Sequence, residues 1–208
     1  MIRVFFLLFE PGPNWDRIAR RRRGFAFVLC LYLMPTIVIS SLVEGWGLQR
    51  WGKWQPSFEK FKEITLTGII TFEIIQTGLF LIMVLVSALL LLKISQTFES
   101  RHNYLQAFTT MAYGFSPLFL MHLMDIGPLV HPWLSLALGI LLSVWILYQG
   151  IPRVMQPDPT HTFGLFLSMI FVVIMMAGMA RVLTGLYLLG IVDFHNSWLT
   201  NNFPNLFR

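Results

Sequence analysis

Five long apolar stretches restrict what this chain of 208 residues can fold into. They cover residues 25–43, 71–92, 104–124, 133–149 and 163–191, with almost no charge inside them. A bilayer core about 30 Å thick is crossed by a helix of roughly 20 apolar residues. A helix also satisfies its backbone polar groups within its own segment, which lipid requires. The sequence therefore predicts an all-α integral membrane protein, a five-helix transmembrane bundle.

Composition supports one membrane domain without a separate soluble domain. Charged residues make up 12% of the chain, against roughly 25% in soluble domains. We expect a cytoplasmic interfacial segment over residues 1–24, a five-span membrane domain over 25–192 and an outer tail over 193–208. The single cysteine, Cys30, lies in the first stretch, so a disulfide within one chain is excluded.

The orientation follows from a cluster of arginines before the first stretch: Arg17, Arg20, Arg21, Arg22 and Arg23. Cytoplasmic segments near a span retain such charges, so we expect the N-terminus inside and, after five crossings, the C-terminus outside. The first outer connection also carries basic residues, which weakens the bias without reversing it. The net charge of +5 comes largely from this cluster and does not indicate nucleic-acid binding.

The segment before the first stretch predicts a short amphipathic helix over residues 14–23. Asn14 is suited to cap it, and Trp15 and Ile18 share one side at i and i+3. Such a helix lies on the inner leaflet with its arginines toward anionic headgroups. An acidic protein partner is the alternative ligand for the arginine cluster. The tryptophan-rich connection over 44–70 is expected along the outer surface, with a short helix over 58–62.

Few residues suggest chemistry. His122 and Asp125 share a helix face and His131 follows a short turn, so the three together could bind a metal or relay a proton. Polar residues at an interface are also ordinary, and we expect no catalytic residue, no cofactor and no metal ligand. Ser116 and Thr184 are expected to bond to helix carbonyls.

Two ionisable residues lie at the edges of the spans. Glu73 is nineteen residues before Leu92, and Arg181 is eighteen after Phe163. Both positions are roughly 27–29 Å from the predicted inner face at about 1.5 Å per residue. An ion pair between the second and fifth helices is therefore allowed. The alternative is that each side chain reaches the outer headgroups separately.

Residues 112–117 and 148–152, together with Met155, resemble the YIP-one domain (Yip) family of polytopic membrane proteins, in its bacterial branch. The motif residues are Tyr113, Gly114, Pro117, Tyr148, Gly150 and Pro152, with Pro11, Trp15 and Ile18 resembling the opening of the family. The resemblance implies five spans with a cytoplasmic N-terminus and suggests a bacterial plasma (inner) membrane. Eukaryotic members bind prenylated Rab GTPases and carry a long cytosolic N-terminal region with an acidic-aromatic motif. The residues before the first stretch do not contain such a motif, so that activity is not transferred.

The motif residues have expected structural roles. Gly114 and Pro117 permit a kink or a close helix approach, since proline removes a backbone donor. Tyr113 is expected to hydrogen-bond a carbonyl freed by that kink. Gly150 and Pro152 are expected to stop the fourth helix.

Three functions from different classes remain open. The first is a non-enzymatic scaffold or accessory subunit that packs against other membrane proteins or against itself, through small-residue faces. Those faces pair Gly139 with Ser143, Gly164 with Ser168, and Ala180 with Thr184. The second is a small permease or ion carrier, and the third is a membrane enzyme that uses the His122 region. The sequence favours the first.

Overall fold

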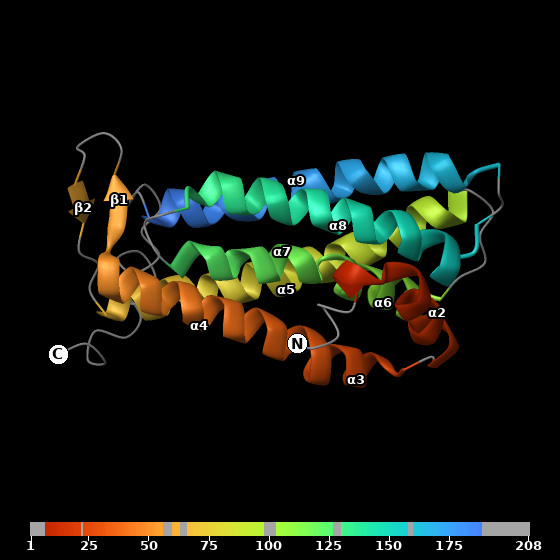
Figure 1. Ribbon diagram of the computed structural model, residues 1–208, viewed down its shortest axis with the longest axis horizontal. Helices are drawn as coiled ribbons and strands as arrows, with labels where there is room; N and C mark the ends of the chain where they lie inside the picture. The colour runs from red at the N-terminus through yellow and green to blue at the C-terminus, as the bar shows by residue number, and fades with distance from the viewer. Residues whose placement is uncertain are drawn as a thin grey trace, which may run out of the picture.

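The computed structural model describes residues 7–21, 23–55, 60–62, 66–97, 103–126, 130–157 and 160–188. These residues form a helical bundle, with one short antiparallel hairpin of β1 (Lys53–Gln55) and β2 (Lys60–Lys62). The long helices run side by side, with the hairpin at one end of the bundle and the first labelled helix at the other (Figure 1). The predicted all-α membrane class is confirmed.

The helices in chain order are α2 (Pro11–Arg21), α3 (Phe25–Val28), η1 (Leu29–Leu33), α4 (Met34–Trp51), α5 (Leu66–Thr97), α6 (Tyr104–Gly114), α7 (Ser116–Met121), η2 (His122–Ile126), α8 (Pro132–Val154) and α9 (Thr162–Leu188). Four uninterrupted segments are long and apolar enough to cross a membrane: Phe25–Trp51, Leu66–Thr97, Pro132–Val154 and Thr162–Leu186. The remaining predicted span consists of α6, α7 and η2 in succession, which are short individually.

The first span contains a wide π turn, η1, just before a proline. Pro35 has no N–H to donate to the carbonyl four residues earlier, which is a common reason for an irregular turn. The Thr36 hydroxyl donates to the Tyr32 carbonyl at 2.7 Å and supplies one extra bond to this turn. The span therefore continues as one helical path from Phe25 to Trp51.

The third span breaks between α6 and α7 at Phe115. Pro117 cannot donate to the Tyr113 carbonyl, and the Ser116 hydroxyl donates to that carbonyl at 2.5 Å instead. The expectation that the Tyr113 hydroxyl would bond a freed carbonyl is thus replaced by a bond from Ser116 to the carbonyl of Tyr113 itself. The predicted roles of Ser116 and Thr184 are confirmed, since the Thr184 hydroxyl donates to the Arg181 carbonyl at 3.1 Å.

Several element boundaries differ from the sequence prediction. The helix of the first span, α4, extends to Trp51, so Glu44 lies inside a helix and not in a connection. The helix expected over 58–62 is wrong, because Lys60–Lys62 is a strand paired with Lys53–Gln55. The helix of the fourth span, α8, does not stop at Gly150 or Pro152 as expected, but continues through Pro152 and ends at Val154. Apolar content marks only the lipid-suited part of a helix, and backbone bonding continues beyond it.

The N-terminal helix is attached to the bundle more firmly than the sequence predicts. It begins at Pro11, so Asn14 is not its cap; the Asn14 amide donates to the Glu10 carbonyl at 2.8 Å. Trp15 is fully buried, and its Nε1–H donates to the Ile146 carbonyl of α8 at 3.0 Å. The helix is amphipathic, as predicted, but its apolar side packs on protein.

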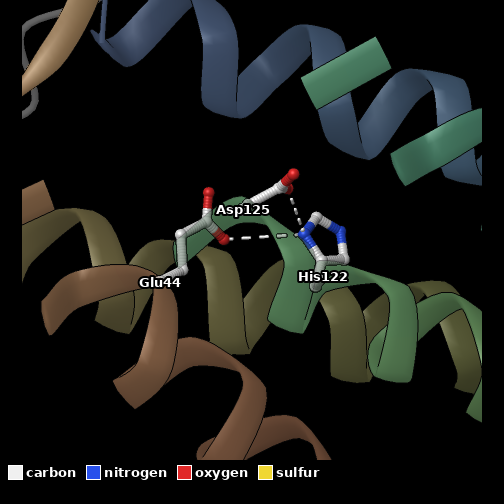
Figure 2. Close-up of side chains that lie close together, drawn as sticks. All are labelled: Glu44, His122 and Asp125. Atoms are coloured by element: carbon white, nitrogen blue, oxygen red, sulfur yellow. Dashed lines mark hydrogen bonds and ion pairs between the residues drawn. The ribbon is translucent and has the colours of Figure 1, made fainter. Parts of the chain in front are cut away.

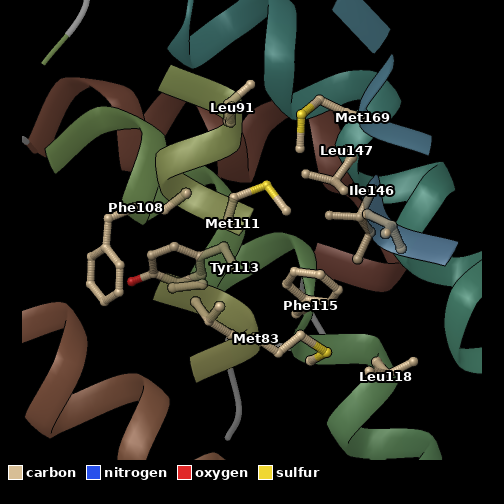
Figure 3. Close-up of a cluster of buried hydrophobic side chains, with 14 of the residues drawn as sticks. Met83, Leu91, Phe108, Met111, Tyr113, Phe115, Leu118, Ile146, Leu147 and Met169 are labelled. Carbon is tan, nitrogen blue, oxygen red and sulfur yellow. The ribbon is translucent and has the colours of Figure 1, made fainter. Parts of the chain in front are cut away.

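The core is a cluster of apolar side chains between the helices (Figure 3). Side chains from four helices meet there: Met83 and Leu91 of α5, Phe108 and Met111 of α6, Ile146 and Leu147 of α8, and Met169 of α9. Gly114 lets Leu147 of α8 approach α6, because a Cβ at this glycine would overlap the Leu147 side chain. Small residues thus set the helix spacing in this core.

Candidate functional site: a buried polar cluster

Five helical segments contribute polar side chains to one site, which we call the buried polar cluster. Its members are Glu44 of α4, Gln76 of α5, His122 and Asp125 of η2, Ser135 of α8 and Arg181 of α9. The 3₁₀ turn of η2 is the local cause, because it presents His122 and Asp125 on the same side at i and i+3. The cluster therefore joins every span of the bundle.

His122 is the centre of the cluster (Figure 2). Its Nδ1 lies 3.1 Å from Asp125 Oδ2 and 3.6 Å from Glu44 Oε2. The Glu44 and His122 side chains are each 5% exposed and that of Asp125 is 3% exposed. The Phe80 ring packs against the imidazole with ring centroids 4.9 Å apart. Charges removed from water in this way require partners.

Arg181 is the permanent cation of the cluster. Its Nη1 lies 3.6 Å from Glu44 Oε1, and its Nη2 lies 3.6 Å from Asp125 Oδ2. The guanidinium therefore bridges the same two carboxylates that face His122. This geometry explains why an arginine is retained in an apolar span.

Neutral groups complete the hydrogen bonding of both carboxylates. The Ser135 hydroxyl lies 2.5 Å from Asp125 Oδ1, and the Gln76 amide donates to Glu44 Oε2. The Gln76 Oε1 atom is buried without a hydrogen-bond partner among the described residues. The cluster is thus well supplied with donors around its carboxylates and retains one unused acceptor.

Glu73 lies beside the cluster on α5. Its carboxylate fits against Gly45, where an added Cβ would be 2.8 Å from Glu73 Oε1. Both carboxylate oxygens are buried, and neither is hydrogen bonded to a described residue, although Ser41 is near. Glu44 and His122 are close enough to interact with it electrostatically.

The predicted site residues are only partly brought together. His122 and Asp125 meet, as expected from their spacing, but His131 is exposed and its Nδ1 accepts from the Trp133 N–H at the start of α8. Arg181 is paired with Glu44 and Asp125, so the allowed pair with Glu73 does not form among the described contacts. Glu44 takes the place that sequence analysis gave to His131 and Glu73.

The sequence does not identify Glu44 as a site residue, because Glu44 follows the apolar stretch and precedes two glycines that are typical of a loop. The same two glycines are also the sequence signal for a close helix approach at this position. Gly45 leaves room for the Glu73 carboxylate, and a Cβ at Gly47 would overlap the backbone of Ile126 in η2. The spacing Glu44-Gly45-x-Gly47 therefore marks a helix that approaches two neighbours closely, and not a flexible loop.

The arrangement has two chemical capacities. Two carboxylates and an imidazole nitrogen converge, with the ligand atoms of Glu44, His122 and Asp125 all within 4.8 Å of one another. Such a set can hold a divalent cation. It can also hold a proton on His122 between two carboxylates.

Comparison with known families agrees with this architecture. The family model described as the Yip1 domain matches residues 5–182, which is most of the chain. The chain belongs to the Yip1 domain family. Members are generally non-enzymatic membrane proteins, and the family is not known as an enzyme family. No curated protein and no solved structure matches the chain.

In this Yip1 domain protein, the motif residue Gly150 of α8 forms part of the surface on which the N-terminal helix α2 packs. A Cβ at Gly150 would overlap the Trp15 ring, so only glycine admits the indole at this position. Trp15 also contacts Tyr113 edge to face, with ring centroids 6.2 Å apart, and Tyr113 packs on Tyr32 at 4.0 Å. Tyr113, Gly114 and Gly150 therefore act together as one packing unit.

Of the other motif residues, Pro117 is buried in α7, whereas Tyr148 and Pro152 lie at the surface of the bundle. Tyr148 is exposed and packs edge to face on Phe166 at 5.0 Å, and Pro152 is exposed in the last turn of α8. Arg153, one residue further, has its Nε 3.4 Å from Asp16 Oδ1 of α2. This end of α8 thus contacts α2 through the Trp15 indole at Gly150 and through the Arg153–Asp16 ion pair.

Three arginines of α2 are exposed: Arg17, Arg20 and Arg21. Arg23 follows α2 and lies over the Phe27 ring at 4.2 Å. Arg22 lies outside the described residues. The described arginines are therefore placed where a headgroup or an acidic partner can reach them.

Proposed function

We propose that this Yip1 domain protein is a non-enzymatic membrane scaffold or accessory subunit that packs against other membrane proteins or against a second copy. The observation that carries the proposal is the outer face of α9. Gly178 and Gly185 are two helical turns apart, and nothing lies within 4 Å of a Cβ built at either one. Another helix can therefore approach the backbone of α9 closely.

The same face continues toward the start of α9. Gly164 and Ser168 are partly exposed, and the Ser168 hydroxyl is bonded to the Gly164 carbonyl at 2.9 Å. That bond hides the polar hydrogen from lipid and leaves a small, apolar-compatible surface. Lipid gives no hydrophobic drive for helix association, so such close packing is what a partner would use.

Two other small-residue faces are used inside the bundle. Gly139 meets Leu118 of α7, and Ser143 is fully buried. Ala180 and Thr184 are 5% and 3% exposed. These residues hold the helices of one chain together, so the proposed partner contact is confined to Gly164, Ser168, Gly178 and Gly185.

The orientation and the location belong to the same proposal. The exposed arginines of α2 lie at the end of the bundle opposite the hairpin (Figure 1). The positive-inside rule places that end in the cytoplasm, with anionic headgroups as its ligands. The hairpin then lies outside, and the bacterial plasma membrane is the proposed location.

The scaffold proposal is tested by blocking the α9 face. A Gly164→Leu, Ser168→Leu double variant keeps the helix lipid-compatible but prevents backbone contact. The matched control is Ala137→Leu, which enlarges an exposed small residue on α8. We expect the native assembly, extracted in mild detergent, to shrink for the double variant only. An unchanged assembly size in both variants would contradict this interface.

A cation carrier is the second candidate, and the buried polar cluster favours it. Ionisable residues inside spans often mark ion or proton pathways. Uptake of a radioactive divalent cation into proteoliposomes tests this reading. Uptake abolished by Asp125→Asn, with the assembly size unchanged, would favour a carrier over a scaffold.

A further inference from the structure

The two carboxylates of the buried polar cluster need one more positive charge than Arg181 supplies. When ionised, Glu44 and Asp125 carry two negative charges, and Arg181 carries one positive charge. A proton on His122, or a cation held by both carboxylates, supplies the remaining positive charge that a buried site requires.

The spacing of the donor atoms suits a small tetrahedral cation. Two ligands that each lie about 2.0–2.1 Å from zinc in tetrahedral geometry are roughly 3.3–3.4 Å apart. His122 Nδ1 lies 3.1 Å from Asp125 Oδ2 and 3.6 Å from Glu44 Oε2. Each carboxylate oxygen therefore already lies at nearly the separation from the imidazole nitrogen that two zinc ligands adopt, and all three ligand atoms are within 4.8 Å of one another.

The surroundings resemble the supporting groups of a metal site. Asp125 is oriented by Ser135, and Glu44 by the Gln76 amide, while Arg181 lies near both. Such partners fix the orientation of metal ligands and tune their affinity. Gln76 is 1% exposed, and the oxygen of this same amide has no hydrogen-bond partner among the described residues. The amide that contacts Glu44 thus keeps one buried oxygen that is not committed to another described group.

We propose that Glu44, His122 and Asp125 bind one divalent transition-metal cation, of which zinc fits best. The cation ties α4 to η2 at the hairpin end of the bundle. Nitrogen and oxygen donors favour zinc over calcium or magnesium, which take oxygen ligands at longer distances or in larger number. The inference is independent of the scaffold proposal, because a structural metal and a partner contact on α9 involve separate residues.

Zinc itself is the probe for the first experiment. The full chain, purified in detergent through an affinity tag without histidine, is stripped with a chelator, dialysed and titrated with Zn²⁺. We expect one zinc per chain by mass spectrometry and a rise in melting temperature on binding. His122→Gln and Asp125→Asn should each weaken zinc binding at least about tenfold. Loss of a group that only supports a metal ligand already weakens metal affinity by about that much.

Two controls keep the result interpretable. His131→Ala removes an exposed histidine that bonds the Trp133 N–H and is not one of the three proposed ligands. This variant should still bind one zinc per chain. If His122→Gln fails to fold, Co²⁺ substitution of the wild-type chain decides instead, through the intense visible absorption of tetrahedral cobalt. A wild-type chain that binds no zinc overturns the proposal. Equal binding by wild type, His122→Gln and Asp125→Asn would show an adventitious ion only and overturn it as well.

Discussion

At the scale of single residues, glycines decide which side chains can meet. Gly150 admits the Trp15 ring, Gly45 admits the Glu73 carboxylate, and Gly47 admits the backbone of Ile126. In each case the glycine is needed for space, since all three lie within helices. A larger side chain would force the neighbour away and lose buried contact.

Gly150 and Trp15 should behave as one coupled unit. Gly150→Leu should destabilise the folded protein by about 1–3 kcal/mol through overpacking. In a Trp15→Ala background the space is vacant, so the same change should cost less. Unfolding in detergent, followed for the four members of this double-mutant cycle, measures the coupling. Equal costs in both backgrounds would show that the indole does not occupy this space.

Arg181 and Glu73 should respond oppositely to loss of charge. In metal-stripped protein, Arg181→Gln leaves Glu44 and Asp125 without their shared cation and should cost about 3–5 kcal/mol. Glu73→Gln replaces a buried carboxyl group, which has no hydrogen bond to a described residue, by a neutral amide of similar size and should be neutral or stabilising. Thermal unfolding of both variants provides the comparison. Strong destabilisation by Glu73→Gln would contradict the expectation that this carboxyl group does not stabilise the fold.

At the scale of elements, periodicity and apolar content predict which segments are helices but not how each is interrupted. The stretch over 104–124 reads as one span, and the structure divides it into α6, α7 and η2. Pro117 indicated a kink, but the hydroxyl that satisfies the Tyr113 carbonyl could come from several residues. A local sequence does not specify that choice, because it depends on which rotamer the packed neighbours allow.

The break between α6 and α7 should depend on Ser116. Ser116→Ala leaves the buried Tyr113 carbonyl without the hydroxyl and should cost about 1–3 kcal/mol. Pro117→Ala restores a backbone N–H that can take over this bond, so Ser116→Ala should cost less in that background. Chemical unfolding of the single and double variants tests this. Identical costs would mean that the Tyr113 carbonyl is satisfied in some other way.

At the scale of the whole molecule, the sequence predicts the class and the order of the spans, while the buried polar cluster depends on tertiary structure. His122 and Asp125 could be paired from their spacing along one helix. Glu44 and Arg181 are 137 positions apart, so only the packing of α5 against both α4 and α9 brings them together. The expectation of a Glu73–Arg181 pair rests on membrane depth alone, and depth does not specify which face of a helix a side chain occupies.

The orientation of the bundle should follow the arginines of α2. In a Cys30→Ser background, which removes the exposed native thiol, Asn205→Cys should react with an impermeant thiol reagent in intact cells. A cysteine placed at Arg20 should react only after lysis. Labelling of Arg20→Cys in intact cells, with Asn205→Cys protected until lysis, would reverse the proposed orientation.

The central claim is that this Yip1 domain protein works by contact within the membrane. Native mass spectrometry of the full chain, released from native membrane in lipid nanodiscs, tests that claim most directly. The account predicts a complex heavier than one 24.0 kDa chain, either a homo-oligomer or an assembly with another membrane protein, that is lost in the Gly164→Leu, Ser168→Leu variant and kept in Ala137→Leu. A lone monomer in native lipid would contradict it.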